Sequence, residues 1–257
     1  MQEKLRLIKW VQISFHNNCI HKDFTIVLYA DSTRTGPKTN NYMTYFLYNW
    51  MGLNKTLFIS INKLTNVGYL PDILKIISDV FFIANFAVFY FIACLLFYFR
   101  TRRVTLDKQS LFMAGYFELT RIGICYALFG LTFAALKFSI NLSRPFCSLT
   151  KADFITIANT DLERCLSSFP SAHTGLSILI AYCLWPYMNK FLKCTSCLVI
   201  LAVATSRITL AMHYPADIVY SAIVTILIIL AGNFTFKILK NKVIKSIGNR
   251  IFRLIFV

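Results

Sequence analysis

The chain has 257 residues, 57% of them apolar and 16% aromatic, and its 27 Lys and Arg against 11 Asp and Glu give a formal charge of +16. Long apolar runs in such a composition indicate an integral membrane protein with one domain rather than a soluble protein. The basic residues lie at the ends of the apolar runs, and no basic, aromatic-interleaved module is visible, so nucleic acid is not expected as a partner.

Residues 1–53 predict a polar or interfacial region without a cleavable signal peptide, because the apolar stretch 24–30 is too short for an h-region. The following stretch, 56–77, is apolar but interrupted by Asn, Lys, Pro and Asp. We expect interfacial or amphipathic helices there, covering the bundle. A sixth, degenerate span is the alternative, and it would reverse the side on which the N-terminus lies.

Five segments predict firm membrane spans, since about 20 helical residues cross a hydrocarbon core of about 30 Å. These segments are 80–99, 113–136, 173–188, 194–212 and 217–236. We therefore expect an all-α, polytopic bundle of transmembrane helices over residues 54–236. Residues 237–257, in which Lys and Arg alternate with apolar residues, would follow as a basic tail. This tail would be either an amphipathic helix on the cytoplasmic leaflet or a solvated helix that extends the last span.

The connections between the spans predict an orientation. Segments 100–112 and 189–193 and the tail after residue 236 are rich in Lys and Arg, and five alternating spans put all three on one side. By the positive-inside rule this side is cytoplasmic. The loop 137–172 and the turn 213–217 then meet at the opposite face. Because the composition suggests a bacterial chain, we expect an inner-membrane protein with its site towards the periplasm.

The cysteines show no spacing typical of metal ligands. Cys194 and Cys197 form a CxxC pair at the start of an apolar run, with no second pair, which favours lipid-facing or core thiols over a zinc site. Cys147 and Cys165 both fall in the polar loop between two spans. A disulfide and two free loop thiols are both compatible with that position.

The first of three polar patches contains Lys137 and Arg144, seven residues apart at the end of a span. If the helix continued, both side chains would lie on one face, and Pro145 would end the helix near there. The pair would either grip the oxygens of a phosphate or snorkel as ordinary cations at a span end.

The second patch, Pro170 to His173, is typical of a helix start, with Pro170 in the first turn. The unpaired N–H groups there form an anion site, to which Ser171 adds a hydroxyl donor. His173 would lie beside the anion and could give a proton to a leaving oxygen. The alternative is a simple capping motif with an interfacial histidine.

The third patch places Arg207 near the end of a span, His213 in the turn and Asp217 in the first turn of the next helix. Asp217 could accept a hydrogen bond from one ring nitrogen of His213 and leave the other free to attack, which is the arrangement of an oriented nucleophile. A structural His–Asp cap is the alternative. Three complementary patches on one face favour the catalytic interpretation.

The spacing resembles that of the type-2 phosphatidic acid phosphatase superfamily over roughly residues 54–236. The resemblance is carried by Lys137-x6-Arg144-Pro145, Pro170-Ser171-Ala172-His173 and Ser206-Arg207-x5-His213-x3-Asp217. It implies a metal-independent phosphatase without cofactors, which acts on a lipid phosphate among membrane lipids through a phosphohistidine.

By that resemblance His213 is the nucleophile, Asp217 supports it and His173 is the general acid. The phosphate would be bound by Lys137, Arg144, Ser171, Arg207 and the backbone N–H of Ala172. A non-catalytic lipid carrier on the same fold is the alternative. The family has Gly where Ala172 stands, and we expect a helical φ there, so that the extra methyl group costs little. The substrate and the oligomeric state are left open.

Overall fold

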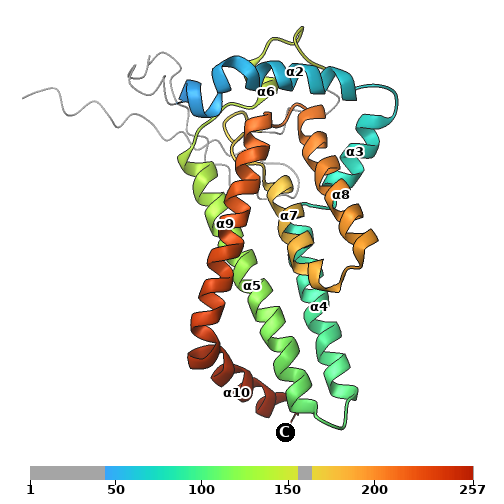
Figure 1. Ribbon diagram of the computed structural model, residues 1–257, viewed down its shortest axis with the longest axis vertical. Coiled ribbons are helices and arrows are strands. Elements are labelled where there is room, and N and C mark those ends of the chain that lie inside the picture. Colours follow the sequence, from blue (N-terminus) through green and yellow to red (C-terminus); the bar gives the residue numbers. More distant parts are fainter. Residues whose placement is uncertain (1–43, 156–163, 257) are drawn as a thin grey trace, which may run out of the picture. The chain divides into compact units, whose positions relative to one another are not determined.

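The computed structural model describes residues 44–155 and 164–256 (Figure 1). All of these residues belong to one compact unit, Asn40–Val257. The described part is helical, as predicted, and its only bridge of the β type joins Ser143 to Leu166. The expectations for residues 1–43 lie outside the described residues, and the division into three regions stays a prediction.

Two short helices precede the long ones, α2 (Leu53–Thr65) and α3 (Leu70–Asp79), after the turns Thr44–Tyr48 and Trp50–Gly52. Helix α2 packs against α8 (Lys190–Thr209) and α9 (Pro215–Leu239), and α3 packs against α8. The stretch before the first long span therefore forms short helices that cover the bundle, which confirms the sequence-based expectation.

Four described helices are long and apolar enough to cross a membrane. They are α4 (Ile83–Arg103), α5 (Lys108–Ser139), α8 and the helix that begins at Pro215, α9. Four of the five predicted spans are thus confirmed, with ends that differ by a few residues. The molecule is a membrane protein built as a helical bundle.

The fifth predicted span is shorter than expected. Helix α7 (Ala172–Leu184) has 13 residues and ends in a 3-10 turn, Trp185–Tyr187. At about 1.5 Å per residue it extends about 20 Å, which is less than a hydrocarbon core. Pro186 has no N–H with which to continue the helix. Helix α7 is instead an inner helix that contacts α4, α5, α8 and α9.

The main core joins α4, α5, α7 and α9 through apolar side chains. Its buried members are Phe86, Cys125, Phe129, Phe133, Leu176, Leu179, Cys183, Ile228 and Ile229. Gly175 allows α7 to approach its neighbours, because a Cβ there would lie 2.6 Å from Phe133 and 2.7 Å from Thr225. The core therefore fixes the first turn of α7 against α5 and α9.

The basic tail folds back on the bundle. After a π-helical turn, Lys240–Ile244, helix α10 (Lys245–Phe256) packs against α5 (Figure 1). The buried ring of Phe252 lies 5.4 Å from the ring of Phe112, centroid to centroid. A solvated continuation of the last span is therefore wrong, and the amphipathic helix has its apolar side on α5.

A polar cluster that no motif indicated ties the helices together far from the predicted site. Arg121 on α5 contacts Glu118 at 2.8 Å and donates a hydrogen bond of 2.9 Å to Tyr182 on α7. Asn233 on α9 donates to the same hydroxyl at 2.7 Å. Arg121 precedes Lys137 by 16 residues, or about 24 Å along α5.

Candidate active site

The turn between α8 and α9 sets the distance between Arg207 and His213. Helix α8 ends in a left-handed residue, Ala211, with φ of 55°. Its N–H donates to the carbonyl of Ile208 at 2.9 Å, and the N–H of Met212 donates to the carbonyl of Arg207 at 3.0 Å. This pair of bonds is a Schellman motif. This motif fixes the number of residues between Arg207, in the last turn of α8, and His213, which follows the motif.

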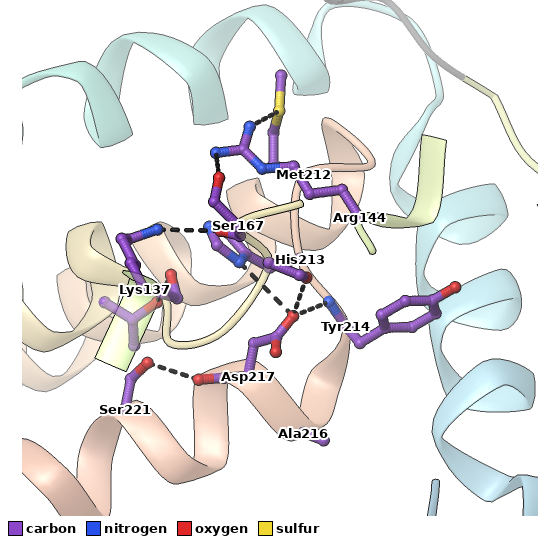
Figure 2. Close-up of polar contacts among 12 residues, drawn as sticks. Lys137, Arg144, Ser167, Met212, His213, Tyr214, Ala216, Asp217 and Ser221 are labelled. Carbon is purple, nitrogen blue, oxygen red and sulfur yellow. Dashed lines mark hydrogen bonds and ion pairs between the residues drawn. The ribbon is translucent and has the colours of Figure 1, made fainter. Parts of the chain in front are cut away.

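Helix α9 begins two residues after His213, at Pro215, and places Asp217 beside the imidazole (Figure 2). Pro215 is the first helical residue, and the backbone N–H of Tyr214 donates to Oδ2 of Asp217 at 2.8 Å. Nδ1 of His213 lies 3.6 Å from the same oxygen. Both side chains are buried. The structure therefore brings the expected histidine and carboxylate together, with one ring nitrogen of His213 facing Asp217.

The environment keeps His213 neutral. Burial lowers the pKa of His213 to about 3, against the opposing effect of Asp217, and the nearby cations Lys137 and Arg207 lower it further. At neutral pH the imidazole is therefore unprotonated on one nitrogen. A nucleophile needs this form.

Asp217 accepts hydrogen bonds from two side-chain hydroxyls. The hydroxyl of Tyr48 donates to Oδ1 at 2.8 Å, and the buried hydroxyl of Ser168 donates to Oδ2. Burial, reinforced by the negative charge of Asp217, raises the pKa of Tyr48 well above its usual range, so Tyr48 keeps the proton that it donates.

Lys137 and Arg144 meet through Ser167 rather than along one helix. Nζ of Lys137 donates to the carbonyl oxygen of Ser167 at 3.0 Å, and Nη2 of Arg144 donates to its hydroxyl at 3.2 Å (Figure 2). The expected common helix face is wrong, because α5 ends at Ser139 and Arg144 is extended. Pro145 does not end a helix but begins a short one, α6 (Pro145–Ser148).

Arg207 approaches the site from the last turn of α8. Its side chain is buried, and Nη1 donates to the hydroxyl of Ser78 on α3 at 3.4 Å. Since Ser78 is the next-to-last residue of α3, the short covering helix positions one of the three cations.

The start of α7 is built as an N-terminus with its cap. Ser171 is the N-cap, fully buried, and its hydroxyl lies 3.0 Å from that of Thr174. Ala172 is the first helical residue and has no positive φ, which confirms the expected helical conformation. Pro170 precedes the cap, so its expected place in the first turn is wrong. His173 follows, with its ring 6.2 Å from that of Phe82.

The three patches supply groups that lie near His173. Four of them interact with it electrostatically: Arg207, His213, Lys137 and Arg144. Together with Asp217, which holds His213, this gives two imidazoles, three cations and one carboxylate in one place. An anion with several oxygens is the ligand that such a set of donors suits.

A disulfide closes the loop beside the site. Cys147, on α6, is bonded to Cys165, and the carbonyl of Cys165 accepts a hydrogen bond of 2.8 Å from the backbone N–H of Arg144. The question that the sequence left open is thus answered. The bond anchors the segment that carries Ser167 and Ser168, which contact the cations and Asp217.

The thiols of Cys194 and Cys197 are free and exposed on α8. Among the residues that the structure describes, no group of three or more His, Cys, Asp or Glu side chains is placed to hold a metal ion.

Sequence reasoning missed several polar residues that support the site. These residues are Tyr48, Asn54, Asn62, Ser78, Ser167 and Ser168. A signal existed only on α2, where Asn54, Phe58 and Asn62 follow at intervals of four and are all buried. Two asparagines on a helix face that also carries a buried Phe indicate an inward polar contact.

The family model described as the PAP2 superfamily matches residues 118–242, a region that includes all three patches. This region belongs to the PAP2 superfamily. The crystal structure of Aquifex aeolicus LpxE is similar in fold to this chain, with a TM-score of 0.54 and 20% identity over 70% of this chain and 94% of the other. No curated protein matches the sequence.

Proposed function

We propose that this PAP2 protein is a membrane phosphatase that hydrolyses a phosphomonoester or pyrophosphate of a lipid. The observation that carries the proposal is that Lys137, Arg144 and Arg207 lie near His173, while Lys137 and Arg207 also lie near His213, which Asp217 backs. The membrane-spanning helices favour a lipid substrate over a soluble one.

In the first step, the ring nitrogen of His213 that faces away from Asp217 attacks phosphorus. The N–P bond forms as the P–O bond to the lipid breaks, and His173, protonated on both ring nitrogens, gives one proton to the departing oxygen. Burial and the neighbouring cations lower the pKa of His173, and the negative charge of the bound phosphate opposes this effect and favours the imidazolium. In the second step, water attacks the phosphohistidine and loses a proton to His173. The N–P bond breaks, phosphate leaves and both imidazoles return to their starting forms.

The three cations and the N–H groups at the start of α7 stabilise the charge on the phosphoryl oxygens. Such fixed donors act strongly where water is excluded. The reaction thus proposed needs no metal ion, because Lys137, Arg144 and Arg207 supply the positive charge.

The substrate lies among lipids whose phosphate is at the membrane surface. Undecaprenyl pyrophosphate, phosphatidic acid, phosphatidylglycerophosphate and a phosphate of lipid A are the candidates. The disulfide between Cys147 and Cys165 supports a site on the extracytoplasmic face, in a bacterium the periplasmic side of the inner membrane, because disulfides persist in oxidising compartments.

The test is phosphate release from a panel of these lipids by purified protein in detergent with EDTA. Wild type should release phosphate from at least one lipid, and His213→Ala and His173→Ala should each lower the rate at least about 10²–10⁴-fold while keeping the melting temperature. A wild-type rate of phosphate release in either variant would contradict the proposed mechanism. Lipid binding without phosphate release would favour a carrier.

A further inference from the structure

Residues ahead of the matched PAP2 region contact the catalytic turn directly. Tyr48, Asn54 and Asn62 all lie before residue 118, where the match begins. We propose that this leading segment, Tyr48 with α2, is a positioning element of the active site that holds Asp217 and both ends of the His213 turn in their working geometry. The proposal rests on the phosphatase function proposed above.

Tyr48 holds the carboxylate of Asp217. Its hydroxyl donates to Oδ1, while Oδ2 accepts hydrogen bonds from the hydroxyl of Ser168 and the backbone N–H of Tyr214 and lies 3.6 Å from Nδ1 of His213. A donor on each oxygen fixes the plane of the carboxylate, because rotation would break one of the bonds. The Tyr48 ring is itself held edge-on by Phe169, at 6.3 Å, and by Tyr214, at 6.4 Å. The hydroxyl is thus aimed by packing.

Asn62 holds the end of α8. Its side-chain NH₂ donates to the carbonyls of Ile208, at 3.2 Å, and Thr209, at 2.9 Å. The same NH₂ group and its amide oxygen bond the backbone of Ile155 at 3.0 and 2.8 Å. The last carbonyls of a helix have no intrahelical partners, so this fully buried amide satisfies groups that the bundle would otherwise leave unpaired.

Asn54 holds the start of α9. Its amide oxygen accepts a hydrogen bond of 2.9 Å from the N–H of Ala216, one residue before Asp217. Phe58, between the two asparagines on α2, is fully buried with its ring 5.3 Å from that of Tyr214. Helix α2 therefore grips the backbone on both sides of His213, and the turn cannot shift without breaking these contacts.

When a residue that does not touch the substrate is lost, a catalytic group that shifts by about 1 Å as a result can slow the reaction by about 10²-fold. Tyr48→Phe keeps the ring and removes only the hydroxyl. We expect kcat to fall by about 10²-fold, KM to change little and the melting temperature to stay near that of wild type, because substrate binding does not involve Tyr48.

Tyr220→Phe is the matched control. The hydroxyl of Tyr220 on α9 donates to the carbonyl of Leu47, the neighbour of Tyr48, but does not contact Asp217. This variant should keep the wild-type kcat. An equal loss in both variants would show that only the anchoring of the segment matters and would overturn the role of the Asp217 contact, as would a wild-type kcat in Tyr48→Phe.

Asn54→Leu is the second variant, in case Tyr48→Phe does not fold. It removes the acceptor for the N–H of Ala216, and a lower kcat in protein that is still folded is expected. A folded Asn54→Leu protein with wild-type kcat would contradict the role of α2.

All variants are compared with wild type and His213→Ala on the same lipid. If wild type releases no phosphate, the proposed function itself fails, whereas an active wild type with fully active variants removes only the positioning role.

Discussion

The described residues of the bundle form two polar clusters that differ in the groups they contain. Among the described residues, the cluster at His173 and His213 contains the cations Lys137, Arg144 and Arg207. Its carboxylate, Asp217, lies next to His213 and accepts hydrogen bonds from Tyr48 and Ser168. Around Arg121, one guanidinium meets one carboxylate, and hydroxyl and amide groups complete the cluster. Several cations gathered beside two histidines suit an anionic ligand with several oxygens, while the pair Arg121 and Glu118 suits a structural role.

The two clusters also differ in how their residues are held. The site at the start of α7 and α9 depends on helix ends, a disulfide and two covering helices. The Arg121 cluster lies within α5, α7 and α9 and is held by regular helix packing. This contrast predicts that substitutions in the first cluster change activity and substitutions in the second change stability.

The largest expected effect is that of Arg207→Ala. Loss of one of three cations should lower kcat/KM by about 10²–10³-fold, because a fixed charge that stabilises the transition state is removed. Phosphate release on the best lipid measures it. Arg207→Lys is the control, since it keeps the charge but not the planar guanidinium. Its kcat/KM should lie between the values of wild type and Arg207→Ala. Full activity of Arg207→Ala would contradict the comparison, since this cation would then have no role in the reaction.

Next in size is the double variant Cys147→Ser/Cys165→Ser. The bond joins residues 18 apart, and closure of a loop of that length contributes about 3 kcal/mol to the free energy of unfolding. The melting temperature in detergent should fall, and activity should fall with it at higher temperature because Ser167 and Ser168 lose their anchor. Cys194→Ser, which removes a free and exposed thiol, is the control. Equal melting temperatures for all three proteins would contradict this prediction.

Glu118→Gln tests the Arg121 cluster. It removes the charge that faces Arg121, and because both side chains are partly exposed we expect a loss of about 1 kcal/mol in stability with kcat unchanged. The variant Glu118→Gln/Arg121→Gln removes both charges, so a double-mutant cycle measures their coupling. A large fall in kcat, with the protein still folded, would show that the Arg121 cluster takes part in function.

The smallest expected effect is that of Ala172→Gly, which restores the family's residue. Since Ala172 is helical, the rate should change by less than about tenfold, or 1.4 kcal/mol. Stability should fall slightly, by less than about 1 kcal/mol, because Gly is unfavourable in a helix. A large rise in rate on the same lipid panel would show that the methyl group crowds the phosphate.

The sequence predicted the parts of this molecule that have a local or periodic signal. Long apolar runs predict α4, α5, α8 and α9, because the bilayer demands a length. The three patches predict the groups around His173, because each patch is contiguous. Tyr48 could not be predicted, since its partner Asp217 is 169 residues away and the contact leaves no pattern along the chain. The predicted length of α7 was too great, because the apolar run that predicts it continues through the 3-10 turn at Trp185–Tyr187.

The left-handed Ala211 has a consequence for how this chain tolerates change. A connection that is counted from a helix end has one permitted length, so an inserted or deleted residue between Arg207 and His213 would turn the imidazole away from the cations. Ala211 is also fully enclosed, beside Phe58 and Phe154. A larger side chain there would meet both steric strain and a filled space. In a library of variants, only Gly and Ala should be tolerated at position 211, and insertions between Arg207 and His213 should abolish activity.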